Sequence, residues 1–303
     1  MNAAAIVTVS GASSQLGVFL LPRLQNAGFA VRAVSRSAPA EGLEIEEGIS
    51  WVGPLLELEL AAGRAPADFL VSCGPLSLAR KLLRQHKPFS SAVVFSTSSI
   101  LTKPDSADPG ERDLVNAIAK EEGQVKAICR ERGIPLVLIR PTMIYGCGLD
   151  RNVSMLYRLG ARTGFIPLSS QAGGRRQPVH ADDLAALAVE ALSSRVDGCL
   201  EGEACGGETL EFREVARRVA ACAEGRVRPL PLPAALLTTV VKIFSSIRPG
   251  TSINTEMVRR QAVNMVFDDT VFRQSLAYQP RPFNPTPADF SIPPKLERFR
   301  LKL

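Results

Sequence analysis

Along the first half of the chain, short runs of apolar and β-branched residues alternate with longer segments whose apolar residues recur at helical spacing. The runs predict six buried strands, at residues 4–10, 29–34, 49–52, 69–72, 92–96 and 135–140. Helices are predicted after Gly17, over 77–85 and over 112–132. Strict alternation of strand and helix predicts an α/β fold, a Rossmann-like, doubly wound parallel sheet that binds its ligand at the carboxyl edge of the strands.

The pattern loosens after Arg140-Pro141. Residues 142–178 are rich in Gly, Arg and Ser and predict loops around a binding cleft, whereas 181–192 predicts a helix that returns to the sheet. Short helical patterns fill the rest, at 211–223, 234–246, 255–262 and 269–276. We therefore predict two parts. Residues 1–145 and 177–200 form a dinucleotide-binding Rossmann domain, and residues 146–176 and 201–303 form a smaller C-terminal substrate lobe.

The composition is that of an ordinary globular protein. The 303 residues are 46% hydrophobic and 22% charged, which excludes a disordered chain and a membrane protein. The net charge of +6 comes from scattered Lys and Arg, and no nucleic-acid-binding motif accompanies it. The charge favours an anionic small molecule such as a nucleotide or nucleotide sugar, or a basic surface without a partner. No nucleic-acid partner is predicted.

Cysteine and histidine usage bears on metals and compartment. The six cysteines form no CxxC pair, and the chain has only two histidines, so no metal site is predicted. Scattered thiols without a signal peptide predict a cytoplasmic protein. The apolar stretch 233–247 is interrupted by Lys242 and is too short to span a bilayer. Helix packing, a homodimer interface, and a surface for a membrane or chaperone-like partner remain its alternatives.

A glycine turn joins the first strand to the first helix. It reads Ser10-Gly11-Ala12-Ser13-Ser14-Gln15-Leu16-Gly17. Gly11 permits the tight turn, and Gly17 permits close packing of helix on strand. The segment Ser13, Ser14, Gln15 and Leu16 would offer backbone N–H groups to a pyrophosphate at the helix N-terminus. The alternative is a strand–helix turn without a ligand.

The end of the second strand bears on the choice of cofactor. An acidic residue there would bind the ribose hydroxyls of NAD(H), but the chain reads Val34-Ser35-Arg36. A guanidinium can grip a phosphate with two parallel hydrogen bonds. Arg36 therefore predicts NADP(H) in preference to NAD(H), with NAD(H) as the remaining option. The competing interpretation is a solvated arginine in a loop.

These motifs resemble a known family. The turn is similar to the Thr-Gly-x-x-Gly-x-x-Gly turn of extended short-chain dehydrogenases/reductases, the NAD(P)-dependent epimerase/dehydratase family, with Ser10 for the Thr and Ser14 for the middle Gly. Three further segments resemble family motifs, at 93–99 (VVFSTSS), 140–146 (RPTMIYG) and 176–185 (RQPVHADDLA). The resemblance covers about the first 185 residues and points to the members that act on sugar nucleotides.

The resemblance implies roles for four residues outside the turn. Ser98 matches the family serine whose hydroxyl bonds a substrate oxygen or keto group. Asn152 and Arg176 match positions that contact the diphosphate of a nucleotide sugar, and Arg260, or Arg259 beside it, could approach the same phosphates from the small lobe as a similar arginine does in the family. Charge-assisted contacts of this kind suit a doubly charged diphosphate. For each arginine, the alternative is an ordinary surface side chain.

One family motif is missing. The catalytic Tyr-x-x-x-Lys pair would fall near Ile118 and Glu122, and no tyrosine occurs between Ser98 and Arg140. Lysine normally lowers the tyrosine pKa for proton exchange during hydride transfer. Another acid, a carboxylate or Tyr145, could replace the tyrosine, or Ser98 could serve only as a strand-end cap. The sequence thus predicts an NADP(H)-binding atypical epimerase, dehydratase or keto-reductase of nucleotide sugars, or else a non-catalytic NADP(H)-binding sensor or scaffold.

Overall fold

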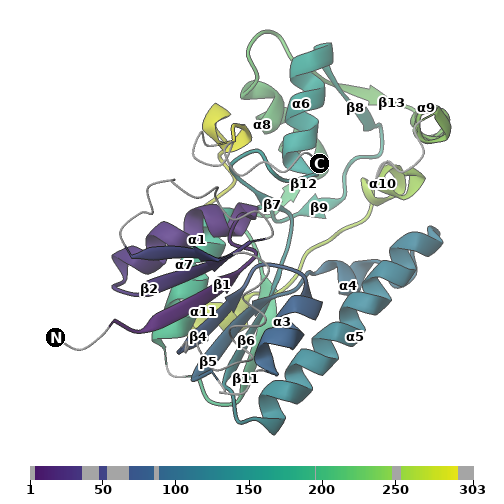
Figure 1. Cartoon of the computed structure of the whole chain (residues 1–303). Helices are drawn as coiled ribbons and strands as arrows, with labels where there is room; N and C mark the ends of the chain where they lie inside the picture. Colours follow the sequence, from purple (N-terminus) through teal and green to yellow (C-terminus); the bar gives the residue numbers. More distant parts are fainter. Residues whose placement is uncertain are drawn as a thin grey trace.

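A computed structural model describes residues 4–35, 48–52, 68–84, 89–194, 196–247 and 254–292 (Figure 1). Its centre is a sheet of seven strands in the order β3-β2-β1-β4-β5-β6-β11, and every neighbouring pair is parallel. The strands are β1 (Ile6–Ser10), β2 (Ala30–Val34), β3 (Ile49–Val52), β4 (Phe69–Ser72), β5 (Ser91–Phe95), β6 (Leu136–Pro141) and β11 (Cys199–Ala204). The order reverses at β1, which lies between β2 and β4. A doubly wound sheet binds its ligand at such a switch point.

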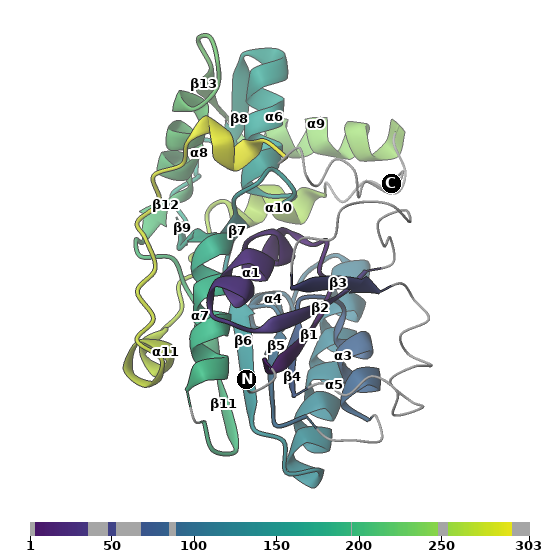
Figure 2. The same ribbon diagram turned by 60° about the vertical axis from the view of Figure 1, so that its left-hand side comes forward.

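Helices cover both faces of the sheet (Figure 2). On one face α1 (Gln15–Asn26) packs beside α7 (Ala181–Ser193). On the other face α3 (Leu76–Leu83) packs beside α5 (Pro109–Glu131), with the short α4 (Ser99–Thr102) before it. This arrangement confirms the predicted Rossmann-like α/β fold.

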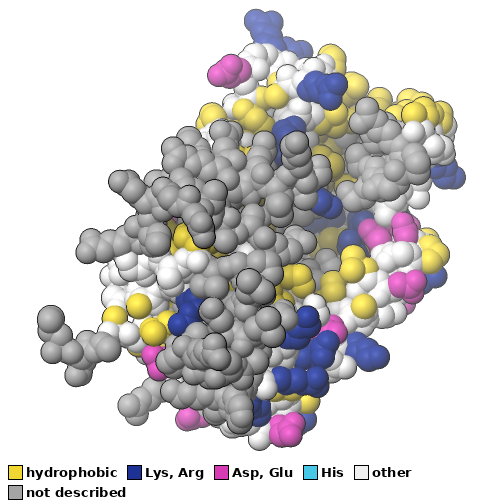
Figure 3. Space-filling view, in the orientation of Figure 1, with side chains coloured by type: hydrophobic (Ala, Val, Ile, Leu, Met, Phe, Trp, Pro, Cys, Tyr) yellow, Lys and Arg dark blue, Asp and Glu magenta, His cyan; other side chains and the backbone are white. Residues whose placement is uncertain are grey.

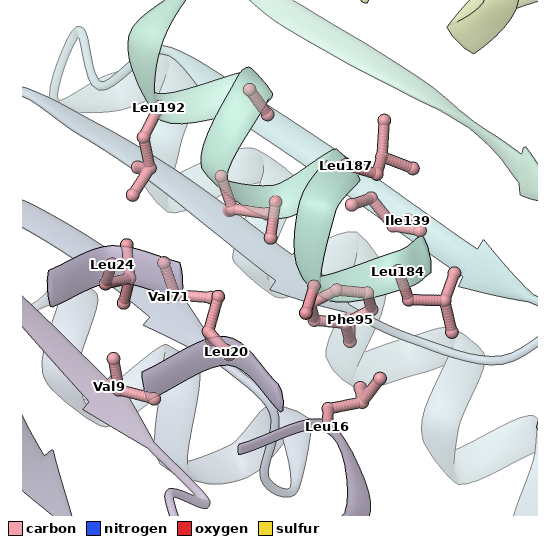
Figure 4. Close-up of a cluster of buried hydrophobic side chains, with 14 of the residues drawn as sticks. Val9, Leu16, Leu20, Leu24, Val71, Phe95, Ile139, Leu184, Leu187 and Leu192 are labelled. Atoms are coloured by element: carbon pink, nitrogen blue, oxygen red, sulfur yellow. The ribbon is translucent and has the colours of Figure 1, made fainter. Parts of the chain in front are cut away.

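Alternation along the strands explains why two cores form. Successive side chains of a strand point to opposite faces. Val71 and Ile139 thus lie in the core under α1 and α7, where Figure 4 shows them beside Leu20 and Leu184. Leu70 lies in the core under α3 and α5. Both faces of the strands are buried, which accounts for their nearly unbroken apolar sequence.

The smaller lobe stands beyond the carboxyl edge of the sheet. Its longer elements are α6 (Val153–Thr163), β8 (Phe165–Ser169), α8 (Phe212–Ala221), β13 (Arg228–Leu232), α9 (Ala234–Ile247) and α10 (Thr255–Arg260). Its short ones are β7 (Ile144–Tyr145), β9 (Arg175–Arg176), β10 (Val179–His180), β12 (Leu210–Glu211) and the 3-10 turn η1 (Pro287–Phe290). A third apolar cluster joins α6, β8 and α8. The expectation of loops over 142–178 was wrong, because α6 and β8 lie there.

The sheet domain draws on more of the chain than residues 1–145 and 177–200. Strand β11 continues to Ala204, and the buried Phe272 of α11 (Thr270–Ser275) belongs to the core under α1 and α7. In the described part of the chain, no helix is long and apolar enough to cross a bilayer.

Candidate functional site

The glycine turn lies at the switch point of the sheet, directly after β1. Gly11 has φ +70°, and a Cβ there would meet Gly74 N at 2.6 Å and Cys73 C at 2.7 Å. Gly17 faces the turn itself, since its Cβ would lie 2.0 Å from the carbonyl oxygen of Ala12. Only glycine fits either position without moving backbone. The turn therefore packs closely against the residues that follow β4.

The backbone N–H groups of this turn are only partly used. Ala12 N–H donates to the Val34 carbonyl at 3.1 Å, and the Ser14 hydroxyl caps α1 by accepting from Gly17 N–H at 3.3 Å. Within the described ranges, no group accepts from the N–H of Gln15 or Leu16. Free amides at a helix N-terminus carry partial positive charge and suit a phosphate oxygen. The turn thus fits the pyrophosphate of a dinucleotide.

A pair of hydroxyls lies at the end of β2, where an acidic residue would bind the ribose hydroxyls of NAD(H). Ser13 Oγ and Ser35 Oγ lie 2.7 Å apart and share a hydrogen bond, with Ser35 buried at the end of β2. No carboxylate occupies the position of Ser35. Arg36, which carries the expectation of NADP(H), lies outside the described residues.

Gln15 connects the turn to the loop after β7. Its amide Nε2 donates to the Gly146 carbonyl at 2.7 Å, across 131 residues of sequence. Gly146 in turn lies against the His180 ring. That ring accepts from Asp182 N–H through Nδ1 at 3.0 Å and bonds Asp289 through Nε2 at 3.0 Å. His180 therefore caps α7 and ties the sheet domain to η1, which are structural tasks.

We expect Gly146→Ala to lower the free energy of unfolding by about 2–4 kcal/mol, as strain and overpacking combine. Gly146 has φ +112°, and an added Cβ would lie 2.9 Å from His180 Nε2, in a ring fixed by hydrogen bonds at both nitrogens. Gly164→Ala is the matched control. It shares a positive φ (+78°) but has no atom within 4 Å of the added Cβ. Urea unfolding measures both, and equal losses would contradict the proposed clash.

Ser98 lies at the carboxyl edge of the sheet, between β5 and α4. Its side chain makes no cap hydrogen bond, and the hydroxyl that accepts from Ser99 N–H at 3.1 Å belongs to Thr97. The Ser98 backbone is fixed instead, because its N–H donates to the Pro141 carbonyl at 3.2 Å. Ser98 is the N-cap residue of α4 by position, but its hydroxyl makes no capping hydrogen bond. Its hydroxyl is held at the strand end without a capping task.

The two positions of the missing Tyr-x-x-x-Lys pair have structural tasks. Ile118 packs against the core under α3 and α5. Glu122 is 3% exposed and forms a buried ion pair with Arg140, whose Nη2 lies 2.5 Å from Glu122 Oε1. Arg140 also reaches Glu201 at 2.8 Å and Glu203 at 3.3 Å, so it ties α5 to β11. Both side chains are therefore part of the packing and ion pairing of the fold.

Tyr145 is not suited to replace the tyrosine. The residue is 1% exposed, and its ring lies edge-on to His180 and Phe283 at centroid distances of 4.9 and 4.8 Å. Burial first, and then the charges of Asp289 and Asp183, raise the pKa of its phenol. A phenol with a raised pKa gives up its proton less readily than an ordinary tyrosine.

Glu111 is a carboxylate that joins the sheet domain to the small lobe, close to α4. It lies in the first turn of α5 and accepts two hydrogen bonds from Arg260 of α10, at 2.6 and 2.9 Å. Ser106 Oγ donates to it at 2.8 Å and Lys103 Nζ at 3.2 Å. Burial would raise the pKa of Glu111, but these hydrogen bonds and charges lower it to about 2. Glu111 is thus ionised at neutral pH.

The structure brings two of the three expected diphosphate ligands together, Arg176 and Arg260, and places Asn152 on another element. Arg260 is held by Glu111, as above. Arg176 is 4% exposed, lies over the Phe212 ring, and donates to the carbonyls of Arg175, Val263 and Arg260. Asn152 is exposed at the start of α6. Arg176 and Arg260 are neighbours within the small lobe, and Asn152 stands on another element of that lobe.

Sequence reasoning did not find Gln15–Gly146 or Glu111–Arg260. Each contact joins residues that are 131 or 149 positions apart. Arg260 had been singled out by resemblance, but no local pattern pairs it with Glu111. The sequence Asp108-Pro-Gly-Glu111 could have indicated that a helix begins here with Glu111 in its first turn. In the fold the Asp108 side chain caps α5 and accepts from Glu111 N–H.

Comparison with known proteins reveals distant relatives. No family model matches the sequence. Among curated proteins, an uncharacterized Sinorhizobium fredii protein, y4nG, is 25% identical over 198 residues, or 62% of this chain. The UDP-glucose 4-epimerase of Vibrio cholerae is 22% identical over 170 residues, or 56% of this chain. The chain spans about half the length of these relatives, 49% of each.

Solved structures match over nearly the whole chain. An epimerase of Methanothermobacter thermautotrophicus superposes with a TM-score of 0.68 at 16% identity, covering 98% of this chain and 91% of that one. The UDP-glucuronic acid 4-epimerase of Bacillus cereus, solved with UDP-glucuronic acid and NAD, gives 0.67 at 14% identity and covers 97% of both. The chain has the fold of the UDP-sugar epimerases. Identity this low shows the epimerase fold and leaves substrate and chemistry to be argued from the site.

Proposed function

We propose that the chain binds a nicotinamide dinucleotide at its glycine turn and acts on a nucleotide sugar. The observation that carries the proposal is the position of the Gln15 and Leu16 amides, which have no acceptor among the described residues and lie at the N-terminus of α1, at the switch point of the sheet. A pyrophosphate there would accept from both amides and from the Ser13 hydroxyl, without displacing a hydrogen bond of the helix.

NADP(H) is the proposed form of the cofactor. Ser35 at the end of β2 carries no charge that would repel a 2′-phosphate, and its hydroxyl together with that of Ser13 could donate to one. Arg36 follows directly in the sequence and would supply the positive charge. Three of the matching structures, a UDP-glucuronic acid 4-epimerase, a UDP-glucose 4-epimerase and the enzyme WbmF, were solved with NAD or NAD⁺. NADP(H) would therefore distinguish this chain from those structures.

A fluorescence titration of the full chain with NADPH and NADH tests the cofactor proposal. We expect NADPH to bind more tightly, and Arg36→Gln to weaken NADPH at least about tenfold while leaving NADH unchanged, since a charge-assisted hydrogen bond contributes about 1.5–3 kcal/mol. The matched control is Arg84→Gln, which removes the same charge from an exposed position after α3. Equal affinities for the two nucleotides would overturn the preference for NADP(H), and no binding of either would overturn the cofactor site.

The nucleotide sugar would lie between the sheet edge and the small lobe. In this proposal Ser98 bonds the reacting oxygen, and Asn152, Arg176 and Arg260 serve the diphosphate. Arg260 is the pivotal one, because Arg176 already donates to its carbonyl and Glu111 holds its guanidinium. A diphosphate would have to compete with Glu111 for Arg260, or accept the donors that Glu111 leaves unused. When bound, the cofactor would supply hydride transfer through its nicotinamide ring.

A second function is favoured by one observation, the fixed Glu122–Arg140 pair at the missing catalytic lysine position. A chain that keeps the cofactor turn but fills the catalytic positions with structural residues fits a non-catalytic NADP(H)-binding sensor or scaffold. The two functions share the cofactor site and differ in turnover. Conversion of a UDP-sugar by the unchanged chain, which the first function requires and the second excludes, separates them.

A further inference from the structure

The small lobe exposes large apolar side chains on three adjoining elements. Helix α9 packs on α10 and β8, and β8 pairs with β13. From these elements six large apolar side chains reach solvent with 40–73% of their surface exposed: Phe165, Leu230, Leu236, Val240, Ile243 and Ile247. We call this set the lobe surface. Figure 3 shows hydrophobic side chains gathered where α9 lies in Figure 1.

The four side chains from α9 form one stripe. Leu236, Val240, Ile243 and Ile247 follow each other at spacings of four, three and four residues, which places them on one side of a helix. Leu237 is the buried contact of α9 and lies on a different side. A helix that packs through one side has no structural need for a second apolar one. The stripe therefore indicates a contact outside the fold.

The two remaining apolar side chains extend this surface along the β8–β13 ribbon. Phe165 pairs with Arg228, and Leu230 lies two residues further along the same strand, so all three occupy one side of the ribbon. Ile166 and Leu168 occupy the opposite side and are buried. The exposed side of the ribbon thus combines apolar and cationic groups.

The charge of this region is one-sided. Segments 159–169 and 223–247 hold four basic residues and one acid, Glu224. The basic residues are Arg162, Arg226, Arg228 and Lys242, all exposed, and none of them forms an ion pair within the described part of the chain. Exposed apolar side chains and unpaired cations on the same elements match the acyl chains and anionic headgroups of a membrane surface.

We propose that the lobe surface docks the protein on an anionic membrane, with α9 lying in the plane of the headgroups. The 14 residues of α9 make a helix about 21 Å long, shorter than the roughly 30 Å hydrocarbon core, so it lies on the bilayer and does not cross it. A second copy of the chain fits less well. A two-fold interface would bring the same four cations of both copies together.

Flotation of the full chain with vesicles tests the proposal. We expect binding to vesicles of phosphatidylcholine mixed with phosphatidylglycerol, and at least about tenfold weaker binding to phosphatidylcholine alone or at high salt, because each Lys or Arg near the surface contributes about fivefold and the region holds four of them. The double variant Val240→Gln, Ile243→Gln should lower binding at least about tenfold, since burial of apolar surface drives insertion. Thermal unfolding followed by circular dichroism verifies that each variant is folded.

The matched control is Ala235→Gln, Thr239→Gln, which adds the same side chains at exposed positions of α9 outside the stripe. It should bind vesicles as the unchanged chain does. Absence of vesicle binding by the unchanged chain would overturn the proposal, and so would equal losses in the two double variants. Light scattering tests whether a second copy of the chain covers the stripe instead. A dimer that becomes monomeric on Val240→Gln, Ile243→Gln, without vesicle binding, would assign the stripe to a second copy.

Discussion

Replacing Glu111 by glutamine is expected to lower the free energy of unfolding by about 3 kcal/mol, the lower end of the loss when one partner of a buried ion pair is removed, because Arg260 then keeps only the more distant carboxylate of Glu256, at 4.0 Å. Arg260 is 8% exposed, and Glu111 accepts from both of its terminal nitrogens. Glutamine keeps the size of the side chain and the capped start of α5, so the loss isolates the charge. Urea unfolding at neutral pH measures it.

A double-mutant cycle separates the ion pair from other effects of the substitution. Glu111→Gln with Arg260→Gln should cost less than the sum of the two single variants, because neither partner is then left charged and alone. Additive losses would show that the pair contributes little to stability.

The same pair predicts a pH dependence with a definite sign. The pKa of Glu111 is lowered from an ordinary 4.5 to about 2 in the folded chain. A lowered pKa stabilises the fold above the unfolded value, and this contribution is lost as pH falls from about 4.5 toward 2. The stability difference between the unchanged chain and Glu111→Gln should therefore shrink over this interval. A difference that stays constant would contradict the ion pair.

The sheet domain could be predicted from the sequence because its strands are buried on both faces. Runs such as 69–72 and 135–140 contain few polar residues, and the strands β4 and β6 lie within a residue or two of them. β11 escaped prediction because its sequence, Cys-Leu-Glu-Gly-Glu-Ala, alternates with charged residues. It lies at the edge of the sheet, where Glu201 and Glu203 reach Arg140, and this pairing depends on the tertiary structure.

The small lobe was harder to predict for a different physical reason. Residues 142–178 are rich in Gly, Arg and Ser, and their polar groups suggested loops. In the fold, Asp150 holds the start of α6 by accepting from the backbone of Asn152 and Ser154, and Arg158 donates to the carbonyl of Gly148. These polar residues therefore fix a helix and its entry, which hydrophobic periodicity does not report.

In the candidate site as well, features set by neighbouring residues could be predicted, and features set by long-range contacts could not. The glycine turn follows from local sequence, because a strand, a tight turn and a helix are adjacent in the chain. The contacts of Arg176 and Arg260 depend on segments 84–149 residues away, and no local pattern specifies them. The missing tyrosine was visible in the sequence. The contacts of the residues at the two expected Tyr and Lys positions could be seen only in the fold. Ile118 makes an apolar contact, and Glu122 forms an ion pair with Arg140.

The largest expected effect on function concerns Ser98. If the chain turns over a nucleotide sugar, Ser98→Ala should lower kcat about 10²–10³-fold, the usual loss when one donor to a developing negative charge is removed. NADPH affinity should stay unchanged, because Ser98 lies after β5 and the cofactor turn follows β1. Product analysis with a panel of UDP-sugars, in the presence of NADP⁺ or NADPH, measures the turnover.

The control for this prediction is Ser99→Ala, a change of the same size one residue further on, in the first turn of α4. Ser99 is not assigned a substrate contact, so its variant should retain the turnover of the unchanged chain. Equal losses in both variants would indicate damage to the β5–α4 connection and remove Ser98 from the proposed chemistry. If the unchanged chain binds NADPH but converts no UDP-sugar, the Glu122–Arg140 ion pair at the catalytic position would support a non-catalytic role. The epimerase fold would then serve as an NADP(H)-binding sensor or scaffold, because the cofactor turn is kept while the proton-transfer positions are filled with structural residues.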